Sequence, residues 1–172
     1  MAKNSGSAKV TALLGSFDRA YNRRSWHGTN LRGAIRGLSA GVAGMRPGPG
    51  RHNIWELVVH AAYWKYAVRR RIARQARGSF ELKGSNWFER NAGQADDEVS
   101  WRRDVALLER THSSLRATIE RLHDSDLART LPGSRLTVFD LITGAAAHDL
   151  YHAGQIQLIK RLLRTGNAPP AG

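Results

Sequence analysis

The sequence predicts an all-α protein that forms an antiparallel four-helix bundle in a single domain, residues 1–172. Three observations support this prediction. Four long segments place apolar residues three and four positions apart, which is the spacing of an amphipathic helix. Stretches rich in glycine, proline or aspartate separate these segments. No part of the chain alternates apolar and polar residues as a half-buried strand does.

The first predicted helix covers residues 8–24, where Val10 and Leu14 begin an apolar face that repeats every three or four positions. A weaker helical segment follows over residues 31–42. It ends before residues 46–50, whose alternating prolines and glycines are a strong stop signal.

The second predicted helix covers residues 54–77. Asn53 is a favourable N-cap, and Glu56 three positions later completes the sequence of a capping box. Gly78 is the expected end of this helix. Residues 78–96 then form an irregular connection, and a connection of this length in a compact domain often covers a site.

The third predicted helix covers residues 97–123 and stops at the polar residues 124–126. The fourth covers residues 138–164, with Thr137 as its N-cap and Asp140 three positions on. The connection between them is short and contains Pro132 and Gly133.

The composition narrows the possible functions. Because the chain has no cysteine, it forms no disulfide and supplies no thiolate as nucleophile or metal ligand. No segment approaches the roughly 18 apolar residues that a membrane span needs, and the polar N-terminus lacks the apolar core of a secretory signal. We therefore expect a cytoplasmic protein with no membrane partner. Both ends of the chain, residues 1–6 and 166–172, are predicted to be flexible.

The net charge of +13 comes from 27 Lys and Arg residues against 14 Asp and Glu residues. Such a balance suggests an acidic partner, which could be nucleic acid, an anionic membrane surface or an anionic small molecule. The alternative is a protein that uses arginine at ordinary solvated positions. Because the sequence has no base-reading motif, we expect no specific nucleic-acid partner, and at most weak, salt-sensitive binding.

The residues that indicate chemistry lie on the fourth predicted helix. His148 and His152 are four positions apart, so one helical turn projects both imidazoles from the same apolar face. This spacing lets two histidines bind one metal ion, although Asp149 replaces the glutamate of the HExxH motif. His60 lies on a comparable face of the second helix, and three histidines from two helices would leave one coordination position open. The alternative for each histidine is a core imidazole hydrogen-bonded to a carbonyl.

Three segments, in this order along the chain, carry a resemblance to a known family: residues 26–28 (WHG), 54–64 (IWELVVHAAYW) and 148–156 (HDLYHAGQI). The chain resembles the DinB-like (YfiT-type) superfamily of metal-binding four-helix bundles. The resemblance implies that His60, His148 and His152 bind a divalent transition metal such as nickel or zinc. Some members of this superfamily are transferases or isomerases that use bacillithiol, mycothiol or glutathione. The resemblance therefore also implies a low-molecular-weight thiol cofactor, a small-molecule substrate and a homodimer.

Three further side chains are candidates for contact with the cofactor. His27 lies in the first of the matching segments, Trp64 lies one turn beyond the histidine of the second helix, and Gln155 lies close beyond the second histidine of the fourth. The structural alternatives are a histidine at a helix end and a core amide bonded to backbone. His112 lies on the apolar face of the third helix, where a core position is favoured over a place near the metal.

Two functions fit these residues. The first is a metal-dependent transferase or hydrolase that acts through a thiol or water at the open coordination position. The second is a non-catalytic metal-binding module whose basic surface engages an anionic partner. An open cleft around the histidines favours catalysis, whereas a closed fourth ligand favours a structural site.

Overall fold

The computed structural model describes residues 7–76, 78, 80–93 and 95–166. Within them the chain folds into helices and forms no strand, apart from an isolated β-bridge between Thr130 and Thr137. The predicted all-α class is confirmed. The elements in chain order are α1 (Ala8–Tyr21), α2 (Leu31–Ala34), α3 (Ala40–Gly44), α4 (Ile54–Ile72), α5 (Asp97–Glu120), the 3-10 helix η1 (Asp124–Ala128) and α6 (Val138–Gly166).

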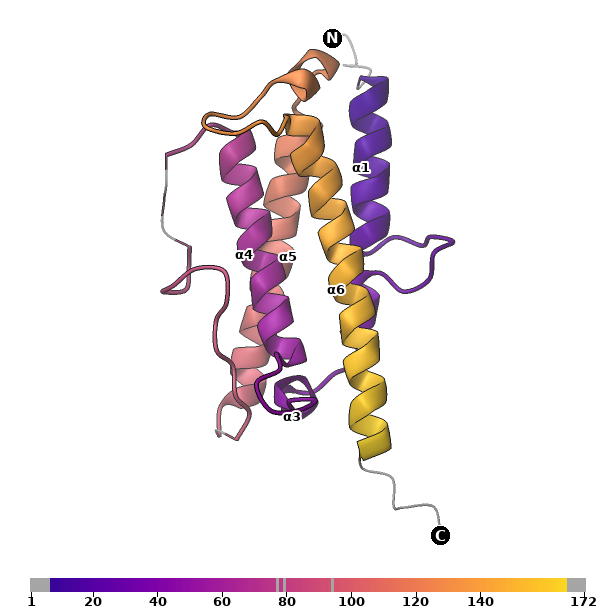
Figure 1. The fold of residues 1–172 in the computed structure, drawn as a ribbon, viewed down its shortest axis with the longest axis vertical. Coiled ribbons are helices and arrows are strands. Elements are labelled where there is room, and N and C mark those ends of the chain that lie inside the picture. The colour runs from indigo at the N-terminus through magenta and orange to yellow at the C-terminus, as the bar shows by residue number, and fades with distance from the viewer. Residues whose placement is uncertain (1–6, 77, 79, 94, 167–172) are drawn as a thin grey trace.

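The four long helices α1, α4, α5 and α6 lie along the longest axis of the molecule (Figure 1). Both α4 and α1 pack against α5 and α6. Figure 1 shows α4 and α5 running in one direction and α1 and α6 in the other. A hydrogen bond from Arg129, beyond the end of α5, to the Ile72 carbonyl at the end of α4 joins the matching ends of the parallel pair at 3.1 Å. The predicted antiparallel order therefore does not extend to the α4–α5 and α1–α6 pairs. The reason is that the long connection after α4 returns to the other end of the molecule before α5 begins.

Helix α4 ends at Ile72, five residues before the predicted end. Arg74 adopts a left-handed conformation with φ of 53°. The Gln75 N–H donates to the Arg70 carbonyl at 3.0 Å, and the Arg74 N–H donates to the Arg71 carbonyl at 3.2 Å. These two bonds form a Schellman motif with arginine in the position that glycine usually takes. The helix thus stops before Gly78 is reached.

The predicted caps of the two helices that carry the histidines are confirmed. The Asn53 side chain accepts from the Glu56 N–H at 2.8 Å, and both residues are buried. At the start of α6, Thr137 and Asp140 form a reciprocal capping box, with distances of 2.8 and 3.2 Å from each backbone N–H to the other side chain. Local sequence therefore determines where both helices begin.

Other predicted boundaries differ slightly. Helix α1 ends at Tyr21 and α5 at Glu120, each three residues early, and the weak segment 31–42 forms the short helices α2 and α3. The predicted flexible ends lie outside the described residues, except that Gly166 is the last residue of α6. No helix in the described part of the chain is both long and apolar enough to cross a bilayer. The cytoplasmic location and the homodimer stay predictions.

A buried ion pair joins α4 to α6 at the junction of two apolar clusters. Lys65 Nζ lies 2.5 Å from Asp149 Oδ2, and the two side chains are 3% and 1% exposed. The ammonium also lies 4.9 Å from the ring centroids of Phe17 and Tyr21, which belong to different clusters. Because Asp149 directly follows His148, this pair constrains the position of the histidines on α6.

We predict that Lys65→Met destabilises the protein by about 3–5 kcal/mol, because it leaves the Asp149 carboxylate buried without a partner. The double variant Lys65→Met/Asp149→Leu should recover most of the loss, since neither charge then has to be desolvated. Urea unfolding of the three proteins at pH 7 measures both effects. A single variant as stable as the parent protein would contradict the prediction.

Candidate metal centre

Three imidazoles from two helices converge on one point. His60 projects from α4, while His148 and His152 project from successive turns of α6. The Nε2 atom of His148 lies 3.2 Å from Nε2 of His60 and 3.0 Å from Nε2 of His152. Possible ligand atoms of the three residues all lie within 4.8 Å of one another, and among the described residues no fourth carboxylate or histidine joins this group. The structure thus brings together the three residues that the sequence singled out.

The spacing of the three nitrogen atoms fits a metal ion. Zinc–histidine bonds are about 2.0–2.1 Å long, so two imidazole nitrogens on one ion lie about 2.8–3.4 Å apart for bond angles between 90° and tetrahedral. Both measured Nε2–Nε2 distances agree with this range. These two distances are compatible with a divalent ion bound between the three imidazoles.

His60 and His152 each make a hydrogen bond through Nδ1, and these bonds indicate which ring nitrogen can bind a metal ion. His60 Nδ1 lies 2.8 Å from the Asn86 carbonyl oxygen. A carbonyl can only accept, so this Nδ1 carries the proton and Nε2 keeps its lone pair. His152 Nδ1 lies 2.7 Å from Gln155 Oε1, which assigns the same tautomer when the amide is oriented in this way. Lone pairs that face one another at such distances repel unless a cation or proton lies between them.

The three imidazoles favour the neutral state that a metal ligand requires. Burial, followed by repulsion from His152 and His60, lowers the pKa of His148 to about 3. Burial also lowers the pKa of His152 to about 4, although the hydrogen bond to Gln155 opposes the shift. The pKa of His60 is lowered by the same cause. All three rings are therefore uncharged at neutral pH and do not need to lose a proton to bind an ion.

The connection between α4 and α5 holds the His60 ring in place. Asn86 adopts a left-handed conformation with φ of 64°, which asparagine tolerates better than most residues. Its carbonyl accepts from His60, and its side-chain oxygen accepts from Trp64 Nε1 at 2.9 Å. Trp64 lies in T-shaped contact with the rings of His60 and His148, with centroid distances of 6.3 and 6.4 Å. Asn86 thus orients one candidate ligand and one predicted cofactor-contact residue together.

Trp87 also holds the His60 ring in place, and it connects this ring to His52 just before α4. Its ring stacks on His60 at a centroid distance of 3.9 Å and on His52 at 3.7 Å, so the indole lies between two imidazoles. His52 Nδ1 in turn lies 2.7 Å from Glu56 Oε2. Trp87 contacts His60, so this long connection lies against the candidate metal centre, and its role in covering a functional site stays a prediction.

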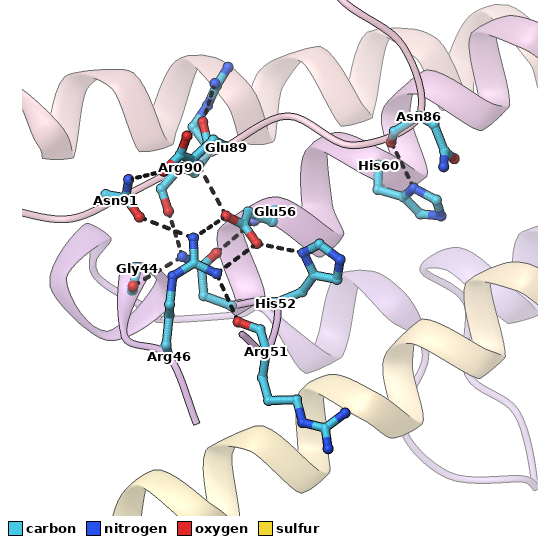
Figure 2. A network of polar contacts seen from close by, with 11 residues as sticks. Gly44, Arg46, Arg51, His52, Glu56, His60, Asn86, Glu89, Arg90 and Asn91 are labelled. Atoms are coloured by element: carbon cyan, nitrogen blue, oxygen red, sulfur yellow. Dashed lines mark hydrogen bonds and ion pairs between the residues drawn. The ribbon is translucent and has the colours of Figure 1, made fainter. Parts of the chain in front are cut away.

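Glu56 connects His52, on which Trp87 stacks, to Arg46 and Arg90 (Figure 2). Its carboxylate accepts from Arg46 at 2.6 and 3.2 Å and from the Arg90 N–H at 3.3 Å, besides its contact with His52. Burial opposes ionisation, but the hydrogen bonds from Arg46 and His52 dominate and lower the pKa of Glu56. Sequence reasoning identified Glu56 only as a capping residue and missed Asn86, Trp87 and His52. The one available signal was the aromatic content of the connection.

The histidines lie in the wall of a cleft of about 790 Å³ between the turn 47–52, α4 and α6. All three candidate ligands line it, together with Trp87 and Gln155. Gln155 contacts His152 and therefore orients one of the candidate metal ligands. The open side of the three imidazoles thus faces a space large enough for a small molecule.

Two other histidines lie away from this centre. His27 is exposed in the turn after α1 and is not among the residues that line the cleft, so its contact with a cofactor stays a prediction. His112 is buried and stacks on Phe17 at 4.6 Å and on Tyr21 at 3.6 Å. The structure therefore supports the interpretation of His112 as a core imidazole.

The chain matches a known protein family. A model of the DinB superfamily matches residues 23–156, which include all three histidines. Comparisons with curated proteins and with solved structures gave no match.

We predict that Asn86→Val weakens metal binding by about 10–100-fold, because a β-branched residue disfavours positive φ and would move the carbonyl that orients His60. Asn86→Gly permits the same backbone conformation and serves as the matched control, with affinity close to the parent protein. Titration with cobalt, followed by absorption, compares the two variants. Equal affinities for both would show that the carbonyl does not position His60.

We also predict that the metal-free protein loses stability as pH falls below about 6.5. Below this pH the histidines of the unfolded chain are protonated, whereas the buried imidazoles of the folded protein stay neutral. The free energy of unfolding therefore falls by up to about 1.4 kcal/mol per pH unit for each buried histidine. The loss should continue until the lowered pKa values of His148 and His152, near 3 and 4, are approached. Chemical denaturation between pH 7.5 and 5 tests this, and His148→Gln should reduce the slope. A flat profile in the parent protein would contradict it.

Proposed function

The chain belongs to the DinB superfamily, and on this basis we propose that it binds a divalent transition metal and uses it in a transferase reaction with a low-molecular-weight thiol. One observation carries the proposal: the Nε2 atoms of His60 and His152 each lie within 3.2 Å of His148 Nε2, at the wall of an open cleft. We further propose that α1, α4, α5 and α6 form the four-helix bundle of DinB-like type, which the packing of each on two others supports.

The number of ligands favours chemistry over a structural role. Structural zinc sites are closed by four protein ligands, whereas catalytic sites keep a position for water or substrate. Three imidazoles from the described residues form this group, and the space beside them is a cleft. Imidazole ligands suit nickel and zinc, so we propose one of these two metals.

A thiol at this centre has to come from a small molecule, because the chain contains no cysteine. A bound divalent ion would act as a Lewis acid that lowers the pKa of a coordinated thiol or water. The protein's own residues hold the ligands and shape the space: Gln155 and Asn86 orient two imidazoles, and Trp87 covers one of them. Trp64 contacts the rings of His60 and His148 but is not among the residues that line the cleft, so its contact with the cofactor stays a prediction.

A second candidate function is a non-catalytic metal-binding module that engages an anionic partner. The observation that favours it is a basic depression on α6, to which Lys160, Arg161 and Arg164 contribute. None of these residues lines the cleft that holds the histidines. Leu158 lines both the depression and the cleft, so the two sites adjoin.

We predict that His148→Ala or His152→Ala abolishes metal binding, since two imidazoles hold an ion far more weakly than three, and abolishes any activity with it. Gln155→Ala should keep the metal but weaken its affinity by about 10–100-fold, as changes to groups that orient a ligand do. Metal content is measured by mass spectrometry. Activity is measured by incubating the loaded protein with an electrophile and, in turn, bacillithiol, mycothiol and glutathione.

The outcomes separate the two functions. Formation of a conjugate with one thiol, lost in both alanine variants, supports the transferase. Metal binding without conjugate formation under any thiol or metal would instead favour the non-catalytic module. Absence of metal binding would refute both.

A further inference from the structure

The wall of the cleft beyond the histidines is apolar although it faces solvent. Tyr151, Leu158 and Leu162 share one face of α6, at positions seven and four apart, and their side chains are 65%, 58% and 47% exposed. The prolines of the turn 47–52 line the opposite side. Apolar surface left in water is unfavourable by about 25 cal/mol per Å² relative to burial. Grouped at a concave site, such residues mark a place where an apolar ligand body binds.

The charge of the cleft is positive. Among the described residues that line it, Arg51 contributes a guanidinium, and no aspartate or glutamate is present. The neighbouring Arg46 is neutralised by Glu56, whereas the Arg51 guanidinium has no hydrogen bond or ion pair with the described residues. In Figure 2 the Arg51 side chain extends from its turn towards α6. A cation placed in this way can pair with a carboxylate that enters the cleft.

The backbone that carries Arg51 is held at both ends. Its N–H donates to the Gly48 carbonyl at 3.2 Å, and its carbonyl accepts from Arg46 Nη1 at 2.8 Å. Because Arg46 is itself bound to the buried Glu56, the turn is tied to the start of α4. The backbone of Arg51 is therefore held beside the cleft before any ligand binds, whereas its exposed side chain becomes ordered on binding.

We propose that the cleft binds an organic anion with an elongated apolar body. Its carboxylate pairs with Arg51, its body lies against Tyr151, Leu158 and Leu162, and its other end reaches the three histidines. This inference rests on the proposed function for the role of the metal, and it adds the class of ligand: an amphipathic carboxylate, either the substrate or the thiol itself. A second copy of the chain is the competing occupant of the apolar face.

The test uses ω-mercaptocarboxylic acids, which have a thiol at one end and a carboxylate at the other. Mercaptopropionic, mercaptohexanoic and mercaptooctanoic acids are titrated into the cobalt-loaded protein, and the thiolate–cobalt absorption band reports ligation. Affinity should rise with chain length, by up to about fourfold for each methylene that is buried. Arg51→Gln should weaken binding of mercaptooctanoic acid by about 3–10-fold, as expected for an ion pair at a partly exposed site. Binding of neutral mercaptooctanol should not change.

Two control variants sharpen the result. Arg135→Gln removes the same charge outside the cleft and should leave all affinities unchanged. Leu158→Gln replaces an exposed side chain, so folding should be preserved, and it should reduce the gain in affinity with chain length while leaving mercaptopropionic acid unaffected.

Octanoate tests the cleft without the metal. It has the chain and the carboxylate but no thiol, and calorimetry should show binding to the metal-free protein that both Arg51→Gln and Leu158→Gln weaken. If octanoate binds equally to all variants or not at all, the inference is refuted, even if cobalt and short thiols bind. If cobalt fails to bind while octanoate behaves as expected, the proposed function fails and the anion site stands. Sedimentation that shows a dimer dissociated by Leu158→Gln, with no dependence on chain length, would assign the face to a second copy of the chain.

Discussion

The geometry of the candidate metal centre depends on the buried ion pair between α4 and α6. Lys65 and Asp149 are almost completely removed from water, where an unpaired charge would cost several kcal/mol. Asp149 follows His148 directly, so a rotation or slip of α6 that broke the ion pair would also carry His148 and His152 away from His60. Apolar contacts alone tolerate small shifts of one helix along another, but a short bond between two buried charges does not. The ion pair therefore fixes the distance between the imidazoles of α4 and α6 more closely than apolar packing of the two helices alone would.

The connection between α4 and α5 fixes the orientation of His60, the candidate ligand on the other helix. Asn86 directs the proton of His60 away from the centre, and Trp87 fills the space between His60 and His52. These contacts are made by a segment without regular secondary structure, held to α4 through the hydrogen bonds of Glu56. A long connection costs little extra entropy of closure compared with a shorter one. It can thus place a carbonyl and an aromatic ring where a helix could not.

Electrostatics at the site differ from those of the whole molecule. The chain is strongly basic, yet the candidate ligands are neutral because burial lowers their pKa values. In the cleft the positive potential comes from Arg51, whose neighbour Arg46 is neutralised by Glu56. The overall charge brings anions towards the protein, whereas single side chains decide where an anion binds. In the anion site proposed above, selectivity for a ligand comes from the apolar wall of α6.

Sequence alone determined the features that are local. Helical spacing and the side-chain caps at Asn53 and Thr137 established the two helices that carry the site. The four-residue interval also placed His148 and His152 on one face, because such effects act within a few residues of the chain. His60 was placed at the centre by its helical face and by the resemblance to a family. Tertiary structure decided the parallel course of α4 and α5, the left-handed conformations that end α4 and orient His60, and the meeting of Trp87, His52 and Arg51 around the cleft. These features depend on contacts between residues far apart in the sequence, whose energies exceed local preferences and leave no repeating pattern along the chain.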